Sequence, residues 1–351
     1  MTKLVPGISV GIVFHNEQER ISKCLSGLLT AYHRYMSEPA SFPIEFIFVD
    51  NRSTDDSRRV VEDFCLENAL PHILSFSETN NMARSRNKVL SLCKHQYLLF
   101  LDADCRPGEA WICKYLDLVY EFTDVRWAAI GGENFPPLSE NKTLYNCQTL
   151  LKKNPLLFLK STQLLGADRS QQVLHVPTCN VLYKTEVLQD LGGFDDSFIR
   201  VGEDLQLSAR LIQNDWKIIF AQGIGVEHFD RTDFKGWFLK CFRYGSVQPQ
   251  ILFSYPNSTS RLRWIPFFVV IFLLLVSTFS PGLAGLATLT MAILVPAFIS
   301  VMSGIQKNIL QWIVFLNGTI IFYCFGYIVG LCKTVWRLSR LQNAKALGEV
   351  D

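Results

Sequence analysis

The most constraining feature of the chain is the segment Tyr97–Asp104, in which five apolar or aromatic residues lead directly into two carboxylates. Such a run predicts a strand buried on both faces, as in the parallel sheets of α/β proteins. Ligands of open α/β sheets bind beyond the carboxyl ends of the strands, where Asp102 and Asp104 are expected. Neighbouring carboxylates repel each other and usually need a cation, and oxygen ligands favour Mg²⁺ or Mn²⁺. The alternative is a pair of solvated turn residues.

Apolar runs and amphipathic segments alternate through the first 230 residues or so. This repeated pattern predicts an α/β domain with a mostly parallel sheet and right-handed crossovers. Asn16 is expected to cap the first helix, and Ser53 or Thr54 to cap the second. The further strands expected are Ile8–Phe14, Ile44–Val49 and His72–Phe76, and helices are expected from Asn16 to about Tyr35 and from Met82 to Cys93.

Polar residues follow three of the expected strands at the point where each strand ends. Glu17 comes after the first strand, Asp50 after the second, and Asp102 with Asp104 after the fourth. The carboxyl ends of parallel strands lie side by side, so acceptors for a base and a ribose would lie next to a metal-binding pair. Each of these residues alone is more often a helix cap or a turn residue, and their shared location carries the prediction.

The C-terminal third of the chain is almost free of charge. No charged residue occurs from Trp264 to Gln306, and after Lys307 the uncharged sequence resumes as far as Cys332. A membrane-spanning helix needs about 20 apolar residues. A very apolar soluble core is the alternative. We therefore expect a transmembrane region over 261–335, with spans at about 264–280, 283–303 and 309–332, and a basic tail over 336–351.

Basic residues flank both ends of this region, which leaves its orientation open. Arg261 and Arg263 precede the first expected span, and Arg337 and Arg340 follow the last. Both pairs favour the cytoplasmic side, whereas three crossings would put them on opposite sides. Either one segment is re-entrant or the tail departs from the rule. No signal peptide precedes the first strand, so we expect the N-terminal domain in the cytoplasm.

Residues 234–260, between the two regions, combine aromatic and basic side chains. Phe234, Trp237 and Phe238 alternate with Lys235 and Lys240. This mixture is typical of an amphipathic helix at a membrane surface. Ordinary packing between domains is the alternative. At a membrane edge the site would be within reach of a lipid-linked acceptor.

Composition and missing motifs exclude several classes of function. A net charge of +2 gives no reason to expect a nucleic-acid partner. No Gly-x-Gly-x-x-Gly follows the first strand, and no Gly-x-Ser-x-Gly elbow is present, which speaks against a dehydrogenase and a serine hydrolase. The ten cysteines are scattered singly and form no close pair of the kind found in zinc or redox motifs. We expect them to be reduced packing residues.

Several segments, in this order, resemble the motifs of family 2 glycosyltransferases with the GT-A fold. Their order and spacing carry the resemblance, because each segment alone is a weak signal. The apolar C-terminal part resembles membrane members of this family that build bacterial exopolysaccharides, including succinoglycan-type enzymes. The matching segments are Gly11–Glu17, Val49–Asp55, Asn80–Asn87, Asp102–Asp104, Gly192–Asp195 and Gly202–Asp204.

The resemblance implies a GT-A catalytic domain over 1–233 that transfers a sugar, with inversion, from a nucleotide-diphospho-sugar. The acceptor would be a polyprenyl-linked or glycan hydroxyl at the bacterial cytoplasmic membrane. Asp204 would be the catalytic base, and Asp102 and Asp104 would hold Mg²⁺ or Mn²⁺, with His228 completing the metal shell. The implied nucleotide-sugar-binding residues are Glu17, Asp50, Arg84, Asn87, Asp102 and Arg243.

The chain departs from the family pattern at two places. Asn51 stands where a second aspartate is common, and the Gln-x-x-Arg-Trp motif of processive relatives is absent near Arg243, which speaks against long-chain synthesis. Glu203 and Asp204 could also be first-turn acids that a helix dipole stabilises. A catalytically inactive, membrane-anchored nucleotide-sugar-binding protein is the main alternative, and the presence of Asp204 argues against it.

Overall fold

The computed structural model describes the chain as two compact units. The first unit comprises Met1–Leu138 and Lys160–Asp230, and the second comprises Ser139–Leu159 and Arg231–Asp351. Within these units the described residues are 4–38, 42–137, 162–164, 170–229, 233–258 and 309–346, with single positions at 264, 268, 272, 275, 278–280 and 282.

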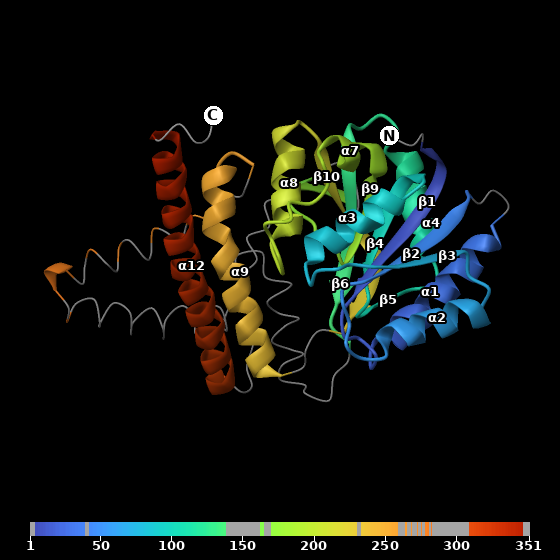
Figure 1. The fold of residues 1–351 in the computed structure, drawn as a ribbon, viewed down its shortest axis with the longest axis horizontal. Helices are drawn as coiled ribbons and strands as arrows, with labels where there is room; N and C mark the ends of the chain where they lie inside the picture. Colours follow the sequence, from blue (N-terminus) through green and yellow to red (C-terminus); the bar gives the residue numbers. More distant parts are fainter. Residues whose placement is uncertain are drawn as a thin grey trace. The chain divides into compact units, whose positions relative to one another are not determined.

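A mixed, mostly parallel sheet forms the centre of the first unit (Figure 1). Its strand order is β3-β2-β1-β4-β9-β6-β10-β8-β7, and β5 pairs with β10. Strands β3, β2, β1 and β4 are parallel, whereas β9 runs antiparallel between β4 and β6. The strands are β1 (Val5–Phe14), β2 (Ile44–Asp50), β3 (His72–Phe76), β4 (His95–Asp102), β5 (Cys105–Pro107), β6 (Trp127–Phe135), β7 (Thr162–Leu164), β8 (Ser170–Val173), β9 (Asn180–Lys184) and β10 (Lys217–His228).

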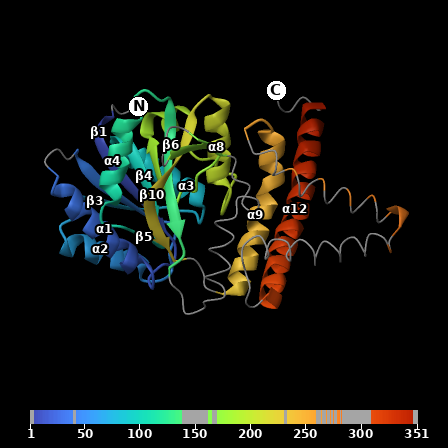
Figure 2. The ribbon, with the colours of Figure 1, turned by 180° about the vertical axis from the view of Figure 1, so that it is seen from behind.

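Helices cover both faces of this sheet, as the front and back views show (Figure 1, Figure 2). Side chains of β1 alternate between the two cores, so that Ile12 and Phe14 pack with α1, α2 and α4 while Val13 packs with α3, α7 and α8. These buried alternating faces confirm the predicted α/β class. The helices are α1 (Ile21–Met36), α2 (Ser57–Glu67), α3 (Met82–Leu92), α4 (Trp111–Glu121), α7 (Thr185–Asp190) and α8 (Glu203–Gln213).

The register of the parallel strands brings their carboxyl ends level. Phe14 of β1 pairs with Asp50 of β2, and Val13 pairs with Asp102 of β4. The loops that follow β1, β2 and β4 therefore start from one edge of the sheet. This edge is where the sequence predicted a ligand site.

The two predicted helix caps are wrong. Helix α1 begins at Ile21, and α2 has Asp56 at its N-cap. Instead, the Asn16 Oδ1 accepts a hydrogen bond from the Thr54 amide at 2.7 Å, and the Asn16 amide donates to the Ser53 Oγ at 3.1 Å. Asn16 and Ser53 thus join two loops at the edge of the sheet and do not cap helices. Small polar side chains often bond to nearby backbone groups in this way.

The second unit contains the helices α9 (Phe234–Ser254) and α12 (Ile309–Ala346), which pack along each other. Trp237 donates a hydrogen bond to the Thr319 Oγ1 at 3.0 Å, and Phe238 stacks on Phe322 with ring centroids 5.2 Å apart. The α9 segment coincides with the predicted interfacial helix. Its contact with a membrane surface stays a prediction.

Glycines bring the backbones of α9 and α12 unusually close. A Cβ atom added at Gly326 would lie 2.0 Å from the Phe242 carbonyl oxygen, and one at Gly330 would lie 2.2 Å from that of Ser246. On α9, a Cβ at Gly245 would lie 2.1 Å from the Tyr323 carbonyl oxygen. Small residues four apart that allow such approach are frequent in helix pairs within membranes.

Among the described residues, one helix is long and apolar enough to cross a membrane. It is the part of α12 from Gly318 to Arg337, with a mean hydropathy of 1.5. Ile321 and Phe325 on this part have exposed fractions of 61% and 58%. The predicted span at 309–332 overlaps it, whereas the spans at 264–280 and 283–303 lie largely or wholly outside the described residues.

Candidate active site

The loops after β1 and β2 are joined by hydrogen bonds between side chains and backbone. The buried Asp50 carboxylate accepts a bond from the Ser53 amide at 2.8 Å and so shapes the turn in which Arg52 has a φ of 62°. The Glu17 amide donates to the Ser57 Oγ at 2.7 Å. These bonds place Glu17 and Asp50 at the same edge of the sheet, as predicted from the sequence.

The hydrogen bonds of Asn51 account for one departure from the family pattern, which commonly has a second aspartate at this position. Its Oδ1 accepts from the Asn81 amide at 3.1 Å and from the Ser85 hydroxyl at 2.9 Å, while its Nδ2 donates to the Asn80 Oδ1 at 3.4 Å. An aspartate here could accept the same bonds but could not donate to Asn80. The amide thus joins the loop after β2 to the start of α3.

Arg86 of α3 is the centre of the electrostatic network. Its guanidinium is buried, donates to the Asp102 Oδ1 at 3.1 Å and forms an ion pair with the Glu203 carboxylate. Burial alone would lower the pKa of Arg86, but the charges of Glu203, Asp102 and Asp204 raise it. Arg86 therefore stays protonated and links the end of β4 to the start of α8.

Glu203 is buried beside this arginine. Burial raises its pKa to about 7, although the charge of Arg86 acts in the opposite direction. One carboxylate oxygen, Oε2, is buried without a hydrogen-bond partner among the described residues. The ion pair with Arg86 is thus the main compensation for burying this charge.

Asp204 lies in the first turn of α8, two residues after Gly202, whose φ of 95° allows the tight entry expected from the sequence. Its Oδ1 accepts from the Leu205 amide at 2.7 Å, and its Oδ2 lies 3.9 Å from the His175 Nε2. Burial raises the pKa of Asp204, and the nearby charge of Asp102 acts in the same direction. A carboxylate made more basic in this way suits proton transfer.

Asp104 forms a second polar group with Glu17 and His228. The Asp104 Oδ2 lies 3.3 Å from the His228 Nε2, and the Asp104 carbonyl accepts from the Phe229 amide at 2.8 Å. Burial and the charge of Asp104 raise the pKa of Glu17 to about 7, against the lowering effect of Arg20. The group carries a surplus of negative charge, and its carboxylate oxygens suit Mg²⁺ or Mn²⁺.

Replacing Glu17 with glutamine is expected to stabilise the cation-free protein at pH 8 by about 2 kcal/mol and to change little at pH 5. Burial raises the pKa of Glu17 from its ordinary value of 4.5, which applies in the unfolded chain, to about 7 in the folded protein. Between these two pH values the folded protein binds a proton that the unfolded chain has already released. The free energy of unfolding therefore decreases as the pH rises from about 4.5 to about 7. Thermal unfolding at both pH values, with a chelator present, measures the effect. The exposed neighbour Glu19 provides the control Glu19→Gln, and an equal shift at both pH values would contradict the assignment.

Two predicted nucleotide-binding residues have structural partners in the loop before α8. Arg84 is half-exposed and pairs with the Asp196 carboxylate at 2.8 Å. Asn87 donates to the Phe194 carbonyl at 2.7 Å and accepts from the Phe194 amide at 2.7 Å. Both residues position the loop around 194–196, and their contact with a nucleotide stays a prediction. Arg243 lies on α9 in the second unit.

Sequence reasoning missed Arg86 and His175. Arg86 shares a face of α3 with the buried Ala83 and Val89, so the helical period offered a signal that this arginine, and not Arg84, is buried. His175 offered none, because no residue pattern around it points to Asp204. Its Nδ1 lies 3.2 Å from the Ser208 Oγ, a contact one helical turn beyond Asp204.

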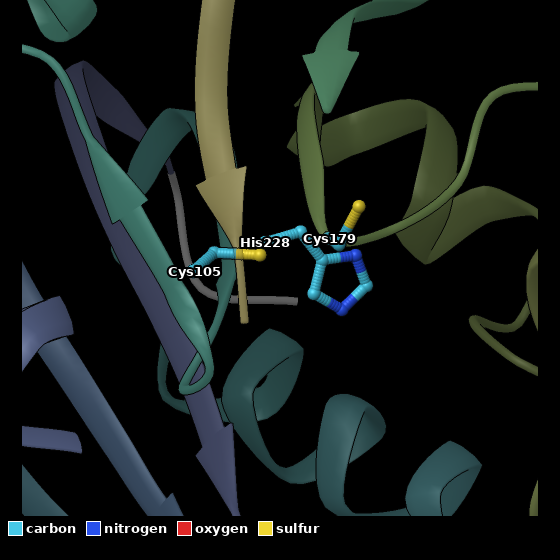
Figure 3. Close-up of side chains that lie close together, drawn as sticks. All are labelled: Cys105, Cys179 and His228. Carbon is cyan, nitrogen blue, oxygen red and sulfur yellow. The ribbon is translucent and has the colours of Figure 1, made fainter. Parts of the chain in front are cut away.

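Sequence reasoning also missed a cluster of Cys105, Cys179 and His228, whose donor atoms lie within 4.8 Å of one another (Figure 3). A hydrogen bond with the Cys105 thiol lowers the pKa of Cys179, whereas burial raises the pKa of Cys105. The nine cysteines among the described residues form no disulfide, and their redox state stays a prediction.

Comparisons with known proteins relate the chain to a family. The family model described as Glycosyl transferase family 2 matches residues 9–192. The chain is 24% identical over 241 residues to the pre-mycofactocin glycosyltransferase of Mycobacterium tuberculosis, covering 66% of this chain and 47% of that protein. It is 24% identical over 254 residues to the glycosyltransferase AglE of Haloferax volcanii, covering 72% of this chain and 76% of that protein. The chain thus spans about half the length of its mycobacterial relative.

A solved structure shares the fold. The mannosyltransferase of Pyrobaculum calidifontis, solved with GDP-Man and Mn²⁺, matches with a TM-score of 0.59 and 14% identity, covering 93% of this chain and 90% of that one. The mixed α/β unit described above therefore has the GT-A fold. Since the matched residues 9–192 make up more than half of the sequence, the chain belongs to glycosyltransferase family 2.

Proposed function

We propose that the chain is an inverting, Mg²⁺- or Mn²⁺-dependent glycosyltransferase that moves a sugar from a nucleotide-diphospho-sugar to a hydroxyl of a lipid-linked or polysaccharide acceptor. The observation that carries the proposal is the network around Arg86. This side chain forms an ion pair with Asp102 of the predicted metal motif. The charge of Asp204, the predicted base, helps to raise the pKa of the same side chain. The two carboxylates that the reaction needs thus share one electrostatic site at the sheet edge.

The donor would bind along the ends of β1, β2 and β4. A polar hollow of about 260 Å³ lies at the start of α1, lined by residues that include Asn16, Glu17, Arg20 and Asp55. Asp50 lies at the adjoining end of β2 and is the candidate for contact with the base. The structural relative from Pyrobaculum was solved with GDP-Man and Mn²⁺, which supports a nucleotide-sugar and a divalent cation as ligands here.

Asp102, Asp104 and His228 would hold the cation. A divalent cation bound there supplies positive charge for the diphosphate that leaves the sugar. The fit rests on the surplus negative charge around Glu17 and on the hard carboxylate oxygens of Asp104, with the His228 Nε2 as a nitrogen donor 3.3 Å from the Asp104 Oδ2. The Arg86 guanidinium donates a hydrogen bond to the Asp102 Oδ1 at 3.1 Å and so restricts the orientation of this carboxylate.

Asp204 would accept the proton of the acceptor hydroxyl. The acceptor oxygen then forms its bond to the anomeric carbon while the bond from that carbon to the diphosphate oxygen breaks, so the configuration inverts. The raised pKa of Asp204 improves it as a base for an alcohol. His175, at 3.9 Å from the Asp204 Oδ2, limits the orientations open to the carboxylate.

A membrane-bound acceptor is supported by the exposed apolar face of α12. Phe325 and Trp336 have exposed fractions of 58% and 59% on a helix that is long enough to span a bilayer. We propose that the enzyme lies at the bacterial cytoplasmic membrane with its first unit in the cytoplasm. A polyprenyl-linked sugar would then reach the site from the bilayer. The predicted further spans and a role of Arg243 at the diphosphate belong to this proposal.

The purified full chain in detergent tests the function. Offered a panel of nucleotide-sugars with Mn²⁺, it is expected to release nucleoside diphosphate from one donor, and Asp104→Asn is expected to lower the rate at least about 100-fold. The control Asp117→Asn removes an exposed carboxylate from α4 and should leave the rate unchanged. Tight donor binding without any turnover by the wild-type protein would instead favour the inactive binding protein.

A further inference from the structure

The Cys105–Cys179–His228 cluster is built from three separate strand ends. Cys105 of β5 and His228 of β10 are direct antiparallel partners, and Cys179 immediately precedes β9. The Cys179 carbonyl accepts a hydrogen bond from the Asp102 amide at 3.3 Å, which ties this segment to the end of β4. The cluster is thus positioned by backbone pairing, the arrangement that makes a binding site precise.

The donor atoms are of a different chemical kind from those of the Asp102–Asp104 group. Two sulfur atoms and an imidazole nitrogen lie within 4.8 Å of one another. Thiolates with imidazole favour soft or borderline ions such as Zn²⁺, whereas carboxylates favour Mg²⁺ and Mn²⁺. Both cysteines are buried, and the Asn134 amide nitrogen lies 3.4 Å from the Cys179 sulfur, where it can donate to a thiolate.

His228 presents one ring nitrogen to each group. Its Nε2 lies 3.3 Å from the Asp104 Oδ2. In Figure 3 the other nitrogen, Nδ1, is on the side of the Cys179 sulfur. A metal-bound histidine usually donates its second N–H to a carboxylate, and Asp104 is already in that place.

We propose that Cys105, Cys179 and the Nδ1 of His228 form a zinc site that competes with the cation site at Asp104. Binding of Zn²⁺ displaces the protons of the two thiols into solvent. A neutral imidazole has one lone pair. When Nδ1 binds zinc, Nε2 keeps its proton and donates it to Asp104, so Nε2 has no lone pair for a cation held by Asp104. Zinc would therefore act as an inhibitor of the proposed reaction, and this last step rests on the proposed function.

Cobalt and zinc titrations of the full chain, with a non-thiol reductant, test the site directly. Co²⁺ is expected to give a near-ultraviolet thiolate-to-cobalt absorption at one equivalent, and Zn²⁺ should remove it. The band should be lost in Cys105→Ser and Cys179→Ser and kept in Cys65→Ser, which removes an equally buried thiol from α2. Absence of the band in the wild-type protein, or its survival in the double serine variant, would overturn the site.

Two further measurements separate this site from the proposed function. Asp104→Asn should lose Mn²⁺ binding, followed by electron paramagnetic resonance, yet keep the thiolate–cobalt band. In the wild-type protein Zn²⁺ should weaken Mn²⁺ binding about tenfold or more, and unchanged Mn²⁺ binding would overturn the sharing of His228. Should the serine variants fail to fold, zinc protection of Cys105 and Cys179 from alkylation in the wild-type protein, read by mass spectrometry, decides the same question.

Discussion

Asp204→Asn is expected to lower the rate of sugar transfer by about 100- to 10,000-fold while donor binding changes little. The asparagine Oδ1 can still accept the bond from the Leu205 amide, so the start of α8 should keep its shape. The amide cannot take the acceptor proton. Initial rates and donor affinity, measured on the same membrane preparation, give the two quantities.

The pH profile provides a second test of Asp204. Because burial raises the pKa of this carboxyl, wild-type kcat/KM should fall as the pH drops through that raised pKa, and this acid limb should disappear in Asp204→Asn. Asp190→Asn, an exposed carboxylate variant on α7, is the matched control. Transfer by Asp204→Asn at the wild-type rate would show that another group is the base.

Arg86→Met is expected to be the most destabilising single change, by about 3–5 kcal/mol at neutral pH. It would leave the Glu203 carboxylate buried without its cation and would remove the partner of Asp102. The pKa of Glu203, already about 7, would rise further because the charge that lowers it is gone. The loss of stability should therefore be largest at high pH and smaller at pH 5, where Glu203 is protonated.

Thermal unfolding of the first unit within the full chain measures this loss, with an expected fall in Tm of roughly 10 °C. The matched control is Arg84→Met on the same helix, which removes only a half-exposed pair with Asp196 and should change stability by less than about 1 kcal/mol. The double variant Arg86→Met/Glu203→Gln should recover much of the stability. If both single arginine variants behaved alike, Arg86 would not be the centre of the network.

Features that depend on neighbours in the sequence were predicted well. The apolar run before Asp102 forms β4, and β3 and the start of α3 lie where the pattern placed them. Strands of a parallel sheet end at a common edge, so the grouping of Glu17, Asp50 and Asp102 followed from strand order alone. The predicted roles of these residues stay predictions.

Features that depend on pairing across the sheet could not be predicted. The antiparallel strand β9 lies between β4 and β6 although it comes later in the chain, and this insertion brings Cys179 to Cys105. The cysteine spacing gave no sign of that contact. Glu203 forms an ion pair with Arg86, which lies 117 positions away in the sequence. Sequence reasoning could not find this pair, because a charged residue on a helix is more often solvated than buried. The predictions of the helix caps were wrong because Asn16 and Ser53 form hydrogen bonds between the loops after β1 and β2 instead.

The glycine contacts between α9 and α12 have a consequence for how this helix pair tolerates change. Backbone lies against backbone at Gly245, Gly326 and Gly330, so the two helices must keep a fixed rotational phase. An insertion of one residue in either helix would rotate the residues that follow it by about 100° about the helix axis, and a bulky side chain would then face the other helix where a glycine now lies. The pair should therefore accept many substitutions on its outer surface but no change of length.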